Sequence, residues 1–155
     1  MELLRESDDP GTDRETFFRA QIFFFLIGAS DGHAKNFSLR LGRRGRFRLA
    51  PLHDILSVAP VVQAGRLQRE RYRLAMSIDG HCRIDEIVPR HFEAEGRACG
   101  LPKGRALELL WDMTDRLGGA LASAALAVGD QGPRALIHAI STDAMGRAAR
   151  VRAMI

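Results

Sequence analysis

The sequence predicts a mainly helical domain with one small β-hairpin in its first half. Apolar residues recur at spacings of three and four in the second half of the chain, whereas residues 37–50 alternate apolar and polar side chains in two short runs. The 155 residues, 46% of them hydrophobic, suit one compact unit over residues 1–155 with its own core. We therefore expect a folded domain and not a disordered chain.

The first helix is predicted over residues 13–27. Thr12 to Glu15 matches a capping box, in which Thr and Glu side chains satisfy free amide groups at a helix start. Residues 23–27 are apolar all round, so we expect this helix to be buried deeply. Gly28 is placed to end the helix, because glycine adopts the left-handed conformation common at helix ends.

A hairpin is predicted after the loop of residues 29–36. Residues 37–41 and 46–50 have the alternation of strands, and the glycines between them suit a short connection. If these strands pair, Asn36 and Pro51 lie side by side, and Asp54 comes near the loop that contains Asp31.

The second half reads as helical scaffold. Pro89 and Gly100 bracket one predicted helix, in which Phe92 and Ala98 could face a core. A second helix is predicted around residues 107–117, with Trp111 as a core anchor, and a last helix follows Pro133. Near its end we expect a solvated group of arginines, with a DNA-facing patch as the alternative: Arg147, Arg150 and Arg152.

The predicted hairpin gathers three oxygen-bearing side chains at one end. Mg²⁺ prefers hard oxygen ligands and is usually held by one or two protein groups together with waters and substrate phosphates. Asn36 and Asp54 suit that task. Asp31 could instead accept a hydrogen bond from an incoming hydroxyl and orient it toward the γ-phosphate of ATP.

Two segments carry a resemblance to a known family. Residues 26–38, LIGASDGHAKNFS, resemble the catalytic loop of HipA-like toxin kinases, and residues 48–57, RLAPLHDILS, resemble the second metal-binding segment of that family. Residues 74–77 and 87–92 also resemble its helical C-terminal lobe. The resemblance covers nearly the whole chain, and it implies a protein-kinase-like C-terminal lobe with the hairpin beside the catalytic loop.

The resemblance also implies an activity, cofactors and site residues. It implies a serine/threonine protein kinase that uses Mg²⁺ and ATP, with Asp31 as catalytic base and with Asn36 and Asp54 as Mg²⁺ ligands. His33 and Lys35 would lie beside the transferring phosphate. The Asp-x-His-x-x-Asn pattern is also similar to the loop of phosphoinositide 3-kinases, so this motif alone indicates phosphoryl transfer more strongly than it indicates a protein substrate.

Partners and compartment are expectations of the same kind. The resemblance implies protein substrates such as an aminoacyl-tRNA synthetase, and a helix-turn-helix antitoxin that binds operator DNA. Cys82 and Cys99 form no CxxC pair, which favours a reducing cytoplasm. The longest apolar run, residues 22–27, is far shorter than the roughly 20 residues of a membrane span. We therefore expect an unexported chain that has no membrane partner.

The family's N-terminal lobe is expected to be missing from this chain. Residues 1–30 contain no lysine and no glycine-rich phosphate loop, so they cannot build the usual grip on a nucleotide. We expect weak or no kinase activity from the chain alone, which would be a fragment, a truncated product or one subunit beside a separate N-lobe. The alternative function is a catalytically inactive module that docks to an antitoxin or to such a lobe.

Two further patterns leave alternatives open. His53 and Asp54, with Asp31 and His33, could form a transition-metal hydrolase site, although the remaining histidines lack ligand spacing in the sequence. The hairpin carries five arginines that suit phosphate contact or, alternatively, a solvated face: Arg40, Arg43, Arg44, Arg46 and Arg48. The net charge of +4 favours acidic partners without specifying one.

Overall fold

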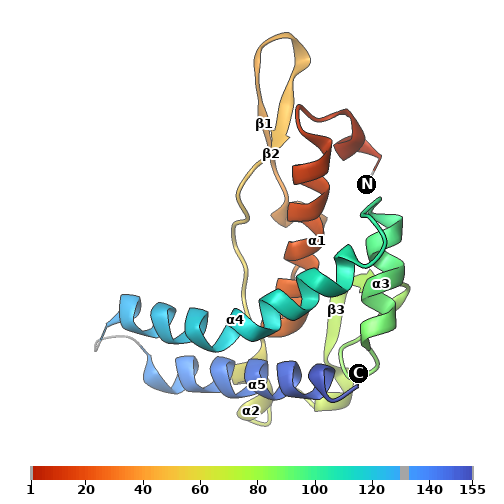
Figure 1. Cartoon of the computed structure of the whole chain (residues 1–155). Coiled ribbons are helices and arrows are strands. Elements are labelled where there is room, and N and C mark those ends of the chain that lie inside the picture. Colours follow the sequence, from red (N-terminus) through yellow and green to blue (C-terminus); the bar gives the residue numbers. More distant parts are fainter. Residues whose placement is uncertain (1, 130–132, 155) are drawn as a thin grey trace.

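A computed structural model describes residues 2–129 and 133–154, and helices dominate it, as predicted (Figure 1). The helices within these residues are α1 (Pro10–Ile27), α2 (Ala59–Gln63), α3 (Pro89–Ala98), α4 (Arg105–Val128) and α5 (Arg134–Arg152). Single 3-10 turns occur at Leu3–Glu6, Ala34–Asn36, Arg43–Gly45 and Arg69–Arg71. The strands form two antiparallel hairpins, β1 (Leu39–Leu41) with β2 (Phe47–Leu49), and β3 (Arg73–Ile78) with β4 (His81–Arg83).

Helix α1 begins earlier than its sequence predicted. Asp9 is the N-cap, and its carboxylate accepts a hydrogen bond from the backbone N–H of Thr12 at 3.2 Å. The predicted capping box at Thr12 is therefore wrong. Pro10 fits the first turn because its missing N–H would have no partner there in any case. The predicted end is confirmed, since the helix ends at Ile27 and Gly28 follows with φ +66°.

Helix α1 is buried on two faces, which explains its all-round apolar sequence. Phe18, Ile22, Phe25 and Leu26 lie in the main core, which they share with β3 and with the helices of the second half. The opposite face belongs to a second cluster, made of Ala20, Phe24, Ile27 and Ala29 with Phe23, Phe37, Leu52 and Ile55 packed against it. The segment after α1 therefore returns along the helix and covers its second face.

The first hairpin confirms the prediction, with strands slightly shorter than expected. Leu39 pairs with Leu49, Arg40 with Arg48 and Leu41 with Phe47. The backbone N–H of Ala50 donates to the carbonyl of Ser38, so pairing continues one step toward the base of the hairpin. The hairpin rises beside the first turns of α1 (Figure 1).

The second hairpin was missed, so the expectation of a single hairpin is wrong. Asp79 and Gly80 form its turn with φ of +50° and +79°, the conformation that tight two-residue turns require. The signal was present in the sequence. Buried Leu74 and Ile78 alternate with exposed side chains along β3, and Asp-Gly follows directly.

Three helices in the second half confirm the prediction of a helical scaffold. Phe92 of α3 is fully buried and meets Phe25 of α1 edge to face, with ring centroids 5.1 Å apart. Ala98, predicted to face the core, is exposed. Helices α4 and α5 lie side by side, and both cross α1 (Figure 1). Trp111 packs against the core from a half-buried position.

The arginines near the end of α5 do not form a solvated group. Arg147 is 2% exposed, and Arg150 donates to the carbonyls of Ile84 and Asp85. Arg152 pairs with Asp115, and its guanidinium lies 4.7 Å from the centroid of the Trp111 ring. The expectation fails because α5 packs against α1 and α4, so that this face of the helix points inward.

Two smaller expectations concern the thiols and the membrane. Cys82 and Cys99 are free thiols, and burial raises the pKa of Cys99 to about 12, so this side chain acts as a small apolar packing group. Within residues 2–129 and 133–154, none of the helices combines the length and apolarity that crossing a bilayer requires.

Candidate functional site

The loop of residues 28–36 leaves the end of α1 in a defined direction. The N–H of Ala29 donates to the carbonyl of Phe24 at 2.8 Å and that of Gly28 to Phe25 at 3.2 Å, a pairing known as the Schellman motif. Gly32 then packs on Phe24 so closely that a Cβ at this position would lie 2.5 Å from its ring. The loop therefore lies on the face of α1 that belongs to the second cluster.

The side chain of Asn36 joins this loop to the segment that follows the hairpin. It is 3% exposed, and its Oδ1 accepts the backbone N–H of His33 at 2.9 Å. Its Nδ2 donates to the carbonyls of His53 at 3.3 Å and Asp54 at 3.0 Å. The predicted proximity of Asn36 and Asp54 is thus confirmed, while the chemical roles assigned to them stay predictions.

Asp54 has an unusual backbone conformation. Its φ is +56°, a region that few residues other than glycine adopt, although Asp and Asn tolerate it better than most. Such conformations persist only where the surrounding structure enforces them, and they are frequent at functional sites. The hydrogen bond from Asn36 to the Asp54 carbonyl is one such restraint, and the Asp54 side chain remains exposed.

Asp31 and His33 form the exposed side of the loop. Nε2 of His33 lies 3.5 Å from Oδ1 of Asp31, and the side chain of His33 is 39% exposed and that of Asp31 68% exposed. The other ring nitrogen of His33, Nδ1, is buried and has no hydrogen-bond partner among the described residues. Lys35 is exposed on the single 3-10 turn that ends at Asn36. The structure thus leaves Asp31 and Lys35 accessible to a substrate.

The donor set at this site fits Mg²⁺. Asn36 and Asp54 offer amide and carboxylate oxygens, the hard ligands that Mg²⁺ takes together with waters and phosphates. Oδ1 of Asn36 already accepts one hydrogen bond, but a carbonyl oxygen has a second lone pair. The chemistry of these two donor groups therefore suits Mg²⁺, while their role as ligands stays a prediction.

The rival transition-metal reading finds no support at these residues. His53 is engaged across the base of the hairpin, where its Nε2 lies 3.0 Å from Oγ of Ser38. Among the described residues, the one cluster of three ligand-type side chains within 4.8 Å lies elsewhere: Asp79, His81 and His91. Sequence spacing did not reveal this cluster, because a hairpin and a helix bring its members together.

The geometry of that second cluster is unfavourable for a metal ion. The rings of His81 and His91 stack with centroids 3.8 Å apart and planes 8° apart. A metal ion lies in the plane of each imidazole that binds it, and two nearly parallel planes at this separation cannot both contain one ion. Nδ1 of His91 also accepts the N–H of Val88 at 3.4 Å, which leaves the proton on the other nitrogen. We therefore interpret the cluster as packing between β4 and α3.

The arginines of the first hairpin separate into two groups. Arg46 pairs with Asp8 at 2.9 Å and Arg48 with Asp13 at 3.1 Å, so these two tie the hairpin to the start of α1. In the part of the chain that the structure describes, three others are exposed and have no acidic partner within 4 Å: Arg40, Arg43 and Arg44. The solvated-face interpretation suits these three, and it also suits Arg46, whose side chain is 70% exposed despite its pairing with Asp8.

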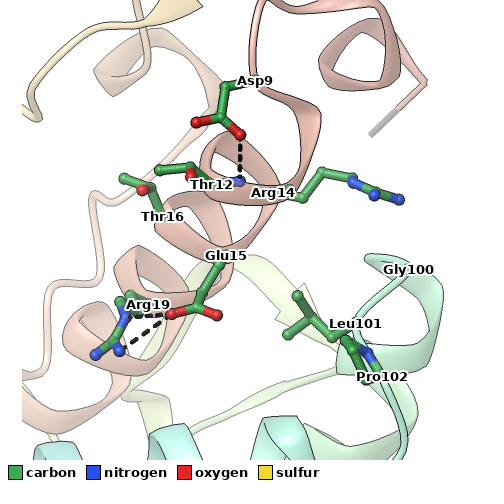
Figure 2. A pocket seen from close by; sticks show the side chains of 10 residues that line it. Asp9, Thr12, Arg14, Glu15, Thr16, Arg19, Gly100, Leu101 and Pro102 are labelled. Atoms are coloured by element: carbon green, nitrogen blue, oxygen red, sulfur yellow. Dashed lines mark hydrogen bonds and ion pairs between the residues drawn. The ribbon is translucent and has the colours of Figure 1, made fainter.

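A hollow of about 660 Å³ lies away from the candidate site, between the first turns of α1 and the loop before α4. Figure 2 shows Asp9, Thr12 and Glu15 on one side of it and Leu101 on the other. The Glu15 carboxylate bonds Arg105 and Arg19, and mainly the bond from Arg105 lowers its pKa. Its charged side chains are all engaged by other groups of the protein, and it lies away from the candidate site, so we do not assign this hollow to the site.

Comparisons with known proteins find one family model and two similar proteins that are named as putative kinases. The model of the family described as "HipA-like C-terminal domain" matches residues 1–121. A Haemophilus influenzae protein named "Putative kinase" is 24% identical over 116 residues, which are 70% of this chain and 34% of that protein. The Sinorhizobium fredii protein named "Putative kinase Y4mE" is 43% identical over 58 residues, 37% of this chain and 14% of that protein.

A solved structure shows the same fold. The complex of HipA, HipB and operator DNA from Shewanella oneidensis MR-1 contains a chain that matches 99% of this one with a TM-score of 0.83 and 21% sequence identity. The match covers 35% of that chain, so the present sequence spans about a third of its length. The sequence motifs, the helical fold and the family match over residues 1–121 lead to one conclusion: this chain belongs to the HipA-like C-terminal domain family.

Proposed function

We propose that this chain carries the magnesium-binding and acceptor-side residues of a serine/threonine protein kinase. The observation that carries the proposal is the Asn36 side chain, whose hydrogen bonds hold the 28–36 loop against residues 53 and 54. Asp31, Asn36 and Asp54 thereby lie on two segments that one buried side chain joins. That is the arrangement a phosphoryl-transfer site needs, because such sites act mainly by positioning and charge stabilisation.

Each residue has a specific task in the proposal. Asp31 accepts the proton of the acceptor hydroxyl as that oxygen bonds to the γ-phosphorus and the bond to the bridging oxygen of ADP breaks. Asn36 and Asp54 would hold Mg²⁺, which neutralises charge on the phosphate oxygens when bound. His33 and Lys35 would lie beside the transferring phosphate, where a cation or a hydrogen-bond donor favours the transition state.

The remainder of the activity belongs to residues outside this chain. The chain spans about a third of the Haemophilus protein and of the Shewanella chain, and residues 2–30 form a 3-10 turn and α1 in place of a nucleotide-gripping sheet. We propose that an N-terminal lobe grips ATP in the active assembly. A HipB-like helix-turn-helix antitoxin is the proposed partner, and a protein hydroxyl, such as one on an aminoacyl-tRNA synthetase, is the proposed acceptor.

Nucleotide binding tests the proposed metal ligands. Mg²⁺ with ATP should raise the unfolding temperature of the chain above its value with Mg²⁺ alone, because a ligand that binds only the folded state stabilises it. Asp54→Asn should abolish the difference, and Asn is chosen because it tolerates the positive φ of this position. Asp79→Asn is the matched control, since Asp79 is also exposed at positive φ but lies in the turn of the second hairpin, between β3 and β4. Equal shifts in all three proteins would contradict the assignment.

Phosphoryl transfer tests the proposed base. Asp31→Asn should leave the MgATP-dependent stabilisation in place and lower transfer of the γ-phosphate by about 100-fold or more, the usual contribution of a general base. The measurement is single-turnover transfer from labelled ATP, with the chain alone and with an N-terminal lobe added. Loss of nucleotide binding in Asp31→Asn would contradict the separation of roles.

A further inference from the structure

The last carbonyl groups of α1 are all bonded, although a helix end leaves them without partners of its own. The backbone N–H groups of Gly28 and Ala29 donate hydrogen bonds to the carbonyls of Phe25 and Phe24, respectively. The next three carbonyls are bound from distant parts of the chain: Leu26 by Arg147 at 2.7 Å, Ile27 by Oγ of Ser57 at 2.6 Å, and Gly28 by the hydroxyl of Tyr72 at 2.8 Å. Side chains from α5, from the segment before α2 and from the residue before β3 thus meet at one helix end.

Arg147 is the central member of this group. Its side chain is 1% exposed, and its guanidinium lies 5.8 Å from the centroid of the Phe25 ring and 5.2 Å from that of Tyr72. Asp143, one turn earlier on α5, balances its charge. A cation at this position also interacts favourably with the negative end of the α1 dipole.

Packing alone does not account for an arginine at this position. Nε of Arg147 is buried without a hydrogen-bond partner in the described part of the chain, and such a group costs stability. A buried apolar side chain of similar length would fill the space without that cost, and replacing buried charges by apolar groups is often neutral or stabilising. What the guanidinium adds is the bond to the Leu26 carbonyl and the pairing with Asp143.

Tyr72, the residue directly before β3, approaches the same helix end. It is 1% exposed, and burial raises its pKa to about 12, so the hydroxyl keeps its proton and donates near neutral pH. The approach is close: a Cβ at position 28 would lie 1.5 Å from this hydroxyl. Glycine at that position is therefore required both by its φ of +66° and by the Tyr72 side chain.

Gly28 is three residues before Asp31, so the orientation of this helix end sets the path of the loop. We propose that Arg147 and Tyr72 are positioning residues for the 28–36 loop, which hold the last carbonyls of α1 and thereby fix where Asp31 is presented. The catalytic consequence of this inference depends on the proposed function. Arg147 lies in α5, outside the residues 1–121 that the family model matches, so the inference extends the site beyond the matched region.

Hydrogen exchange of the purified chain tests the positioning directly. The variants are Tyr72→Phe, which removes the hydroxyl that donates to Gly28 and lies 3.5 Å from Oδ2 of Asp143, and Arg147→Met, which removes the guanidinium. Arg150→Met is the matched control, because Arg150 is on the same helix and also donates to backbone carbonyls, but to those of Ile84 and Asp85. All proteins are compared at a temperature where circular dichroism shows each of them to be folded.

The expected result is local. Peptides that cover residues 28–36 should exchange about tenfold faster in Tyr72→Phe and Arg147→Met, the effect of losing roughly one hydrogen bond, and should be unchanged in Arg150→Met. If Arg147→Met does not fold, Tyr72→Phe decides the question. Unchanged exchange at residues 28–36, or a uniform acceleration along the chain that follows the loss of global stability, would overturn the inference.

A kinetic measurement adds a quantity that a loss of global stability alone would not change. With an N-terminal lobe present, Tyr72→Phe should lower kcat for phosphoryl transfer while KM for ATP stays unchanged, because Asp31 faces the acceptor and not the nucleotide. A raised KM with unchanged kcat would overturn the positioning role. If the wild-type protein transfers no phosphate, the proposed function fails, and the exchange data still decide whether the two residues position the loop.

Discussion

At the scale of single residues, Asn36 shows how one side chain can organise a site. Its amide oxygen accepts a hydrogen bond from the backbone of His33 in its own loop. Its amide nitrogen donates to the carbonyls of His53 and Asp54, which are 17 and 18 residues further along the chain. Because the group is buried, each bond is made in a medium of low dielectric constant, where leaving any of them unmade would be costly. The same amide that the sequence suggested as a metal ligand is therefore also a structural connection.

His91 provides a prediction at this scale about pH. Burial lowers its pKa, and the neighbouring His81 and Arg90 lower it further, whereas Asp79 acts in the opposite direction. The unfolded chain therefore binds this proton at higher pH than the folded chain, so stability should fall as the pH drops below the ordinary histidine value of about 6.5. Urea unfolding between pH 8 and pH 5 should show this loss.

The matched variants for this prediction are His91→Gln and His138→Gln. His91→Gln should weaken the pH dependence of the urea midpoint, because it removes the group that titrates differently in the two states. His138 is exposed on α5, and its replacement should leave the dependence as it is in the wild type. An unchanged dependence in His91→Gln would show that other groups are responsible.

At the scale of elements, the first hairpin depends on α1 for its position. Its three-residue strands are too short to be stable alone, and an isolated two-stranded hairpin is marginal in water. Asp13, on the first turn of α1, is 2% exposed and accepts hydrogen bonds from Nε of Arg48 and from the backbone N–H of Leu49. One buried carboxylate therefore fixes β2, and through it the base of the hairpin where Asn36 and Asp54 meet.

Asp13→Ala should accordingly loosen the hairpin. We expect a loss of about 1–3 kcal/mol in the free energy of unfolding, the range for losing hydrogen bonds to a buried charged acceptor. Urea unfolding measures this loss, and hydrogen exchange should rise in residues 39–49. Asp8→Ala is the control, because Asp8 pairs with an exposed arginine, Arg46, and should change stability far less. Equal effects of the two variants would contradict the anchoring role of Asp13.

At the scale of the whole molecule, α1 separates two apolar clusters with different tasks. The main cluster joins α1 to the second hairpin and to the helices of the second half, whereas the smaller cluster holds the loop and the segment of residues 52–55 against the other face. The residues proposed for phosphoryl transfer thus lie over the smaller cluster, and the large core supports them through α1.

Phe92→Ala tests the central place of the main cluster. Phe92 is fully buried against Phe25, and removing a buried aromatic ring costs about 3–5 kcal/mol, a large part of the roughly 5–15 kcal/mol that stabilises a typical domain. The single tryptophan, Trp111, allows urea unfolding to be followed by fluorescence. Leu126→Ala, at an 83% exposed position, should change stability by no more than about 0.5 kcal/mol. Similar losses in the two variants would contradict this account of the core.

Much of the fold could be predicted because its signals are local. Gly28 ends α1, the alternation in residues 37–50 forms a hairpin, and Pro89 and Pro133 lie at or next to the starts of α3 and α5. The proximity of Asn36 and Asp54 followed from the hairpin, because antiparallel strands return the chain to its starting point. These features depend on turn chemistry and side-chain periodicity, which are properties of short segments.

The burial of Arg147 could not be predicted from such local signals, although the helical periodicity of α5 indicated it. Arg147 is spaced three or four residues from Ala144 and Val151, which are buried on one face of α5 together with Ala148. This spacing indicated that Arg147 lies on the buried face of the helix. Its side chain was expected in solvent because a charged residue is rarely buried without partners. The partners, Asp143, Tyr72 and the Leu26 carbonyl, are brought together only by packing of α5 on α1.

The sequence by itself determined the family and the helical class, and it supplied the residues that we propose for phosphoryl transfer. These results depend on motifs and on side-chain periodicity, which can be recognised in the linear sequence. Only the tertiary structure decided which distant side chains bind the end of α1, that Asp13 anchors the hairpin, and that His81 and His91 stack. The physical reason is that such contacts join residues tens of positions apart, and their formation depends on how whole elements bury their apolar faces against one another.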